Sequence, residues 1–136
     1  MIFLKMANEI IVVATPEPTS ITDSYALIKS FKLDGGKAKI KILLNMCQSE
    51  EEGLQVGKRL KDICTHFLGN TTEFLGVINR DDQVVKAIRH QKAFLEMVPD
   101  CIASKQIQKI AALLKADLFE NKELDAFYHS MKGALS

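Results

Sequence analysis

Polar residues that could take part in binding or catalysis lie in three short segments, each directly after an apolar, β-branched run. The segments are Thr15 to Ser20, Asn45 to Ser49 and Asn79 to Asp82. If the preceding runs are parallel strands, these segments meet at the carboxyl edge of one sheet, where helix N-termini offer free backbone N–H groups to a ligand. Helix caps, strand-ending prolines and loop asparagines produce the same pattern without a ligand. Both interpretations stay open on the residues alone.

Nucleotide chemistry at such an edge normally needs a glycine-rich phosphate loop. The chain has seven glycines, and none stands in a GxxxxGKS/T or GxGxxG arrangement. Asp81 and Asp82 could ligate Mg²⁺, but adjacent acids without a phosphate site more commonly form a turn and a helix cap. No spacing of serine, cysteine and histidine indicates a nucleophile. We expect no catalytic residues, no metal site and no hydrolysis by this chain alone.

Composition indicates an ordinary globular chain. The 136 residues are 47% hydrophobic and 26% charged, with a net charge of +1, which gives no electrostatic reason to bind nucleic acid. Three widely spaced cysteines fit reduced thiols in a cytosol. The longest apolar run, Ile10 to Ala14, is too short to span a membrane. We therefore expect a cytoplasmic protein that binds no nucleic acid.

Three strand-then-helix units follow one another along the chain. The expected strands span residues 9–15, 38–46 and 73–78. The first helix is expected to begin at a capping box of Ser20 and Asp23, the second at Ser49, and the third at Asp82. Such an order predicts an α/β fold, with a parallel sheet and flanking helices joined by right-handed crossovers.

The alternation of strands and helices ends after the third unit, and a helix is expected over residues 104–118. A terminal helix should follow within residues 119–136, with an apolar stripe of Leu124, Phe127, Tyr128, Met131 and Leu135. The stripe suits a core helix or a docking helix, and we favour the core because few basic residues flank it. No linker interrupts the chain, so we expect a single α/β domain over residues 1–136.

One segment carries a specific resemblance. Residues 7–29, with the stretch Pro-Glu-Pro-Thr-Ser-Ile-Thr-Asp at 16–23, resemble the segment after the switch regions of MinD/ParA-type P-loop ATPases. Within these, the sequence is most similar to the flagellar-number regulators of the FlhG type, also called FleN or YlxH. The similarity continues in order to about residue 115, through Leu43–Met46, Phe74–Ile78 and Asp82–Arg89.

The resemblance concerns only the C-terminal half of the family's chain. The Walker A loop and its lysine would precede residue 1, so the resemblance implies a partial P-loop NTPase-like fold of the SIMIBI type, with the Walker A half absent. The chain is then either a fragment or a naturally shortened relative, and we expect a fragment.

Site residues carry over from the resemblance one by one. Asn45 would hydrogen-bond the adenine edge, and Asn79, Arg80 and Asp81 would form the wall over the ring. The family usually has proline where this chain has Asn79, which changes the shape of that wall. The expected cofactor is ATP or ADP, contacted on its adenine side only, with Mg²⁺ bound only when the missing half is present.

Partners are implied in the same way. Pro16, Glu17, Ser20 and Asp23 would lie near a dimer interface. The implied partners are a second copy or the missing N-terminal half, an FlhF-like GTPase or flagellar proteins, and the inner membrane as a peripheral contact through the C-terminal helix. A different class of function is a protein-interaction module without nucleotide, which dimerises or binds a partner through an open sheet edge.

Overall fold

The computed structural model describes residues 2–69 and 72–134, with only the backbone described for residues 119–125, 127, 128, 131, 132 and 134. The elements are α1 (Ile2–Lys5), β1 (Glu9–Ala14), α2 (Pro18–Leu33), β2 (Lys39–Cys47), α3 (Glu50–Leu68), β3 (Thr72–Asn79), α4 (Asp82–Arg89), α5 (Phe94–Met97) and α6 (Ile102–Ala134). They form two compact units, one up to Gln106 and one from Ile107 onward.

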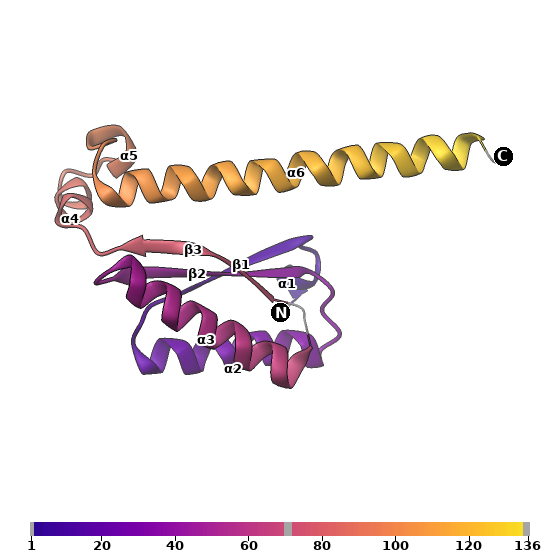
Figure 1. Ribbon diagram of the computed structural model, residues 1–136, viewed down its shortest axis with the longest axis horizontal. Coiled ribbons are helices and arrows are strands. Elements are labelled where there is room, and N and C mark those ends of the chain that lie inside the picture. The colour runs from indigo at the N-terminus through magenta and orange to yellow at the C-terminus, as the bar shows by residue number, and fades with distance from the viewer. Residues whose placement is uncertain (1, 70–71, 135–136) are drawn as a thin grey trace. The chain divides into compact units, whose positions relative to one another are not determined.

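The first unit is built on a parallel sheet, as the sequence predicted, and its strand order is β1-β2-β3. Val12 pairs with Ile42, and Ile42 pairs with Phe74. The crossover helices α2 and α3 cover the same face of this sheet (Figure 1). Same-handed connections between successive neighbouring strands require that arrangement.

The core of the first unit lies between that face and the two helices. Its fully buried side chains include Ile28, Phe31, Ile40, Ile42, Leu44 and Leu60. β1 alternates as a strand at the edge of a sheet does. Val12 and Ala14 point into the core, whereas Ile11 and Val13 are 43% and 56% exposed on the opposite face.

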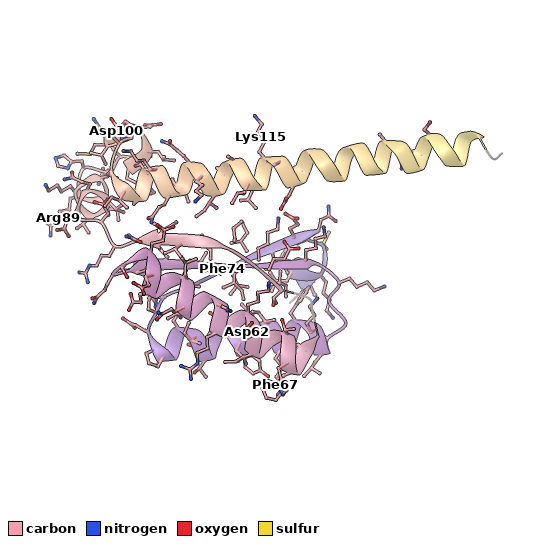
Figure 2. All side chains as sticks on the ribbon, viewed as in Figure 1. Asp62, Phe67, Phe74, Arg89, Asp100 and Lys115 are labelled. Atoms are coloured by element: carbon pink, nitrogen blue, oxygen red, sulfur yellow. The ribbon has the colours of Figure 1, made fainter. Side chains whose placement is uncertain are left out.

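Two glycines let α3 approach β3 closely. The ring of Phe74, which is labelled in Figure 2, occupies the space that a Cβ at Gly57 would take. The side chain of Val77 does the same at Gly53. Both glycines are buried. The helix and strand therefore pack at a distance that larger residues would not allow.

The helical spacing of Leu54, Gly57, Leu60, Cys64 and Phe67 predicts an apolar stripe along α3, which is confirmed in its middle and wrong at its ends. Leu60 and Cys64 are buried, but Leu54 is 49% exposed and Phe67 is 66% exposed. Phe67 instead makes an edge contact with the ring of Tyr25 on α2, with centroids 6.4 Å apart.

The observed N-termini of the helices can be compared with the predicted N-cap residues. Ser49 caps α3 as predicted, because its side chain accepts a hydrogen bond from the Glu52 N–H at 3.1 Å. The capping box of Ser20 and Asp23 is wrong, since α2 begins at Pro18. Proline favours the first helical position because its fixed φ suits the helix and its absent N–H needs no partner there.

The C-terminal region is helical over a longer span than predicted. The expected helix over residues 104–118 and the expected terminal helix over 119–136 are one unbroken helix, α6, up to Ala134. The predicted stripe of Leu124, Phe127, Tyr128, Met131 and Leu135 lies outside the side chains that the structure describes. Within the described part of the chain, no helix combines the length and the apolar character needed to cross a membrane.

Candidate functional site at the carboxyl edge of the sheet

Three loops meet where the strands end, as the sequence predicted. They are residues 15–17, 48–49 and 80–81, which lead into α2, α3 and α4. The Arg80 N–H donates to the Cys47 carbonyl at 2.7 Å, which ties the ends of β3 and β2 together. In the first loop, the Thr15 N–H donates to the Ser20 hydroxyl at 2.9 Å. The edge is therefore ordered by its own backbone hydrogen bonds.

Two hollows open at this edge. The Glu17 hollow measures about 350 Å³ and is lined by Thr15, Pro16, Glu17, Pro18, Met46, Gln48, Glu52 and Arg80. The Asp82 hollow measures about 440 Å³ and is lined by Gln48, Arg80, Asp81, Asp82 and Ile102. Because Gln48 and Arg80 line both, the two hollows adjoin at these side chains.

Arg80 holds the position between the hollows. Its backbone is fixed to β2, while its side chain is exposed and forms no ion pair with any residue in the described ranges. A guanidinium group is planar, permanently charged and able to stack on an aromatic ring. Of the four predicted base-binding residues, Arg80 has the side chain most available to a ligand.

Asp81 acts as a double helix cap. Its Oδ1 accepts from the Gln83 N–H at 2.9 Å at the start of α4, and its Oδ2 accepts from the Ala103 N–H at 3.3 Å in the first turn of α6. The Gln83 bond is the largest of several hydrogen bonds that lower the pKa of this carboxyl, against an opposing effect of burial. The cap of α4 is therefore Asp81, and the interpretation of Asp82 as the cap is wrong.

Asn79 is engaged by a residue that sequence reasoning missed. Its N–H donates to the Gln106 Oε1 at 2.7 Å, and its Oδ1 accepts from the Gln106 Nε2 at 3.1 Å. The pair joins the end of β3 to the first turns of α6. Since the two residues are 27 positions apart, no local pattern could have indicated the contact.

Asn45 supports an irregular end of β2. Its Oδ1 accepts from the Met46 N–H at 2.9 Å, and Met46 has the left-handed φ of 57°. The pairing register shifts between Leu44 and Cys47 at the same point. Asn45 is half-buried and lines neither of the two hollows, while Met46, which we did not predict, lines the Glu17 hollow.

The predicted interface residues divide between two places. Pro16 and Glu17 line the Glu17 hollow. Ser20 and Asp23 line a separate groove of about 490 Å³ that follows β1 and α2. Only the first two therefore share a cavity with Arg80.

Other groups at the edge have structural partners. The Glu52 Oε2 accepts from the Gln48 N–H at 2.7 Å, and burial, with the Glu52 charge, raises the pKa of the Cys47 thiol to about 11. A thiol with so high a pKa is protonated at neutral pH and is a poor nucleophile. Within the described residues, no group of three or more acidic, histidine or cysteine side chains is arranged to hold a metal ion.

Comparison with solved structures defines the class of fold. The chain is similar to the MinD cell division protein of Aquifex aeolicus, with a TM-score of 0.64 and 19% identity over 83% of this chain and 46% of that one. No protein-family model matches the chain. The three-stranded parallel sheet and its helices are thus part of a P-loop NTPase-like fold of the MinD type, which confirms the predicted fold class.

Relatives in sequence indicate to which branch of the MinD/ParA class the chain is similar. The chain is 38% identical over 109 residues to the antiactivator FleN of Pseudomonas aeruginosa, which is 80% of this chain and 39% of FleN. It is 28% identical over 117 residues to the flagellum site-determining protein YlxH of Helicobacter pylori, which is 85% of this chain and 39% of YlxH. These findings relate the chain to part of the FlhG-type proteins of the MinD/ParA class, as the resemblance implied. The chain spans about two-fifths of either relative.

Proposed function

We propose that this chain contributes the adenine side of a nucleotide site in a flagellar-number regulator, without phosphate contacts of its own. The observation that carries the proposal is the Arg80 guanidinium, which lies between two adjoining hollows at the strand ends and has no ion-pair partner among the described residues. The relationship to FleN and YlxH supplies the biological setting.

The chemistry of the edge suits a purine base. Arg80 offers a flat cationic surface on which an adenine ring can stack. Asn45 lines neither hollow, but it precedes Met46, which lines the Glu17 hollow, and its amide has the donor and the acceptor needed to read the edge of adenine. The Oδ1 of Asn45 already accepts one hydrogen bond, from the Met46 N–H, and a second lone pair remains for a ligand.

Asn79 and Asp81 have supporting roles in this site. Their side-chain oxygens are held by Gln106 and by two helix N-termini, so they position the loop that carries Arg80. Mg²⁺ and the phosphates would be bound by the remainder of a longer protein, and we expect no hydrolysis by this chain alone.

The relative affinities of the chain for ATP, ADP and adenosine test the proposal directly. If only the adenine side is contacted, ATP, ADP and adenosine should bind the 136-residue chain with dissociation constants within a few-fold of one another. Isothermal titration or NMR chemical-shift mapping at millimolar ligand would measure them. Binding of ATP that is far tighter than that of adenosine would show phosphate contacts and contradict the proposal, as would no binding of any of the three.

Variants locate the site. Arg80→Ala should weaken adenosine binding about 5- to 10-fold, the value of a partly exposed cation–π contact. Arg89→Ala is the matched control, because it removes the same charge from an exposed position in the last turn of α4 (Figure 2) and should leave binding unchanged. Equal losses in the Arg80 and Arg89 variants would indicate a nonspecific charge effect.

The cellular role proposed is control of flagellar number or placement, by analogy with the names of FleN and YlxH. Proposed partners are the remainder of a longer protein and, at the flagellar pole, an FlhF-like GTPase or flagellar proteins. Deletion of the gene should change the number or position of flagella seen by electron microscopy. Unchanged flagellation in the deletion strain would contradict this role.

A further inference from the structure

We propose that Gln106 is a positioning residue for the site at Arg80, because its side-chain amide holds the strand end from which Arg80 projects. This inference rests on the proposed adenine site and adds to it a residue that lines neither hollow. Gln106 lies near the start of α6, within the same compact unit as the three strands.

The Asn79 N–H points away from β2 and so needs an acceptor on its other side. The N–H of the next residue, Arg80, donates to the Cys47 carbonyl of β2 at 2.7 Å. Successive residues of an extended strand point their N–H groups to opposite sides in the plane of the sheet. On the side away from β2, the Asn79 N–H meets the Gln106 Oε1, which accepts its hydrogen bond at 2.7 Å.

An amide side chain suits both polar groups that Asn79 presents. While the Gln106 Oε1 accepts from the Asn79 N–H, the Gln106 Nε2 donates to the Asn79 Oδ1 at 3.1 Å. A carboxylate has only acceptors and an ammonium group only donors, whereas glutamine has both in one planar group. Both residues are half-buried, where a polar group left unpaired is costly. Gln106 therefore fixes the backbone and the side chain of Asn79 together.

Three consecutive residues around the site are each bonded to a different part of the fold. Asn79 is bonded to α6, the Arg80 N–H to β2, and the Asp81 carboxylate to the first turns of both α4 and α6. The start of α6 thus holds the residues on both sides of Arg80. Without the Gln106 bonds, the loop could adopt other positions, and the apparent affinity for a ligand falls with the fraction of molecules that are competent to bind.

Adenosine titration of matched variants tests this role. Gln106→Met removes both hydrogen bonds and keeps a long side chain with a similar helix propensity. It should raise the dissociation constant for adenosine about 3-fold, less than Arg80→Ala does, because the guanidinium is still present. Gln108→Met makes the same change at an exposed position of α6 that lines neither hollow, and it should leave the constant unchanged. Unchanged binding by Gln106→Met, or equal losses in both variants, would overturn the proposal.

A double variant distinguishes positioning from a general structural effect. If Gln106 acts through Arg80, Gln106→Met should cause no further loss of adenosine affinity in a chain that already carries Arg80→Ala. Independent effects would instead multiply. A residue that only stabilises the fold would lower the affinity by the same factor in both backgrounds, and that result would contradict the positioning role.

Amide hydrogen exchange measures the anchoring without a ligand. The Asn79 N–H loses its acceptor in Gln106→Met and should exchange at least about 5-fold faster, while the N–H of Ile42, in the core of the sheet, should be unaffected. An unchanged circular dichroism spectrum would show that the variant is folded. Unchanged exchange at Asn79 in a chain that binds adenosine would refute the role of Gln106 alone. If the parent chain bound no adenosine, the proposed function and the role of Gln106 in it would both be wrong.

Discussion

Replacing Asp81 should release two helices at once. Its carboxylate accepts backbone hydrogen bonds from Gln83 and Ala103, at 2.9 and 3.3 Å. Loss of one such cap typically costs about 1 kcal/mol, so Asp81→Ala should lower the free energy of unfolding by about 2 kcal/mol. Asp81→Asn keeps one acceptor oxygen and should lose about 1 kcal/mol. In urea, the midpoint of the circular dichroism transition should fall by roughly 1 M for the alanine variant.

The neighbouring carboxyl is the natural control. Asp82 is exposed in the first turn of α4 and forms no cap there, so Asp82→Ala should cost no more than about 0.5 kcal/mol through the helix dipole. If Asp81→Ala were no more destabilising than Asp82→Ala, the interpretation of Asp81 as a double cap would be refuted.

The effect of Asp81 should also depend on pH. Hydrogen bonds lower its pKa in the folded state, so its contribution to stability is present above the ordinary value of about 3.9. That contribution is lost as the pH falls through the folded-state pKa. The stability gap between the parent chain and Asp81→Asn should therefore be full at neutral pH and shrink in acid. A gap that stays constant down to acid pH would contradict the carboxylate's role.

Three further changes probe the packing around the site. Gly57→Ala should lower the free energy of unfolding by about 1–3 kcal/mol, because the new methyl group meets the Phe74 ring, and Phe74→Leu should restore part of the loss. Met46→Gly should be neutral or stabilise by up to about 1 kcal/mol, since glycine accepts the φ of 57° without strain; a clear loss of urea stability would contradict this reasoning. Native alkylation at neutral pH, followed by mass spectrometry, should modify Cys101 and leave Cys47 unreacted, because Cys47 is buried with a pKa of about 11; early labelling of Cys47 would show that the edge opens.

Elements with strong local signals were predictable. The apolar run of β1 and the capping serine of α3 place their elements to within about one residue, because both depend on neighbours in the sequence. The start of α2 was missed by three residues, because the predicted N-cap was Ser20 and the observed one is Glu17, with Pro18 at the first helical position that it favours.

Side-chain roles at the edge were less predictable. The alternation of strands and helices predicted where the loops converge. It therefore also predicted that Asn79, Arg80 and Asp81 lie at the strand ends. Their partners did not follow, because Gln106 and Ala103 belong to a helix that begins more than twenty residues later along the chain. The predicted roles in base binding stay predictions, and the structure distinguishes the exposed Arg80 from its two engaged neighbours.

The exposed end of α3 shows a similar limit. Periodicity treats every turn of a helix as equal, so Phe67 was expected to be buried with Cys64. In the structure, Cys64 is buried, while Phe67, labelled in Figure 2, lies in the last turn. Its ring makes edge-to-face contacts with Tyr25 and His66. Burial depends on how far the partner surface extends, which the sequence of one helix does not contain.

The unbroken course of α6 has a mechanical consequence. Its first turns bind Asp81 through Ala103 and Asn79 through Gln106, and the same helix continues without interruption to Ala134. Whatever displaces these first turns of α6 must therefore break or stretch the hydrogen bonds that hold Asn79 and Asp81, the two residues on either side of Arg80.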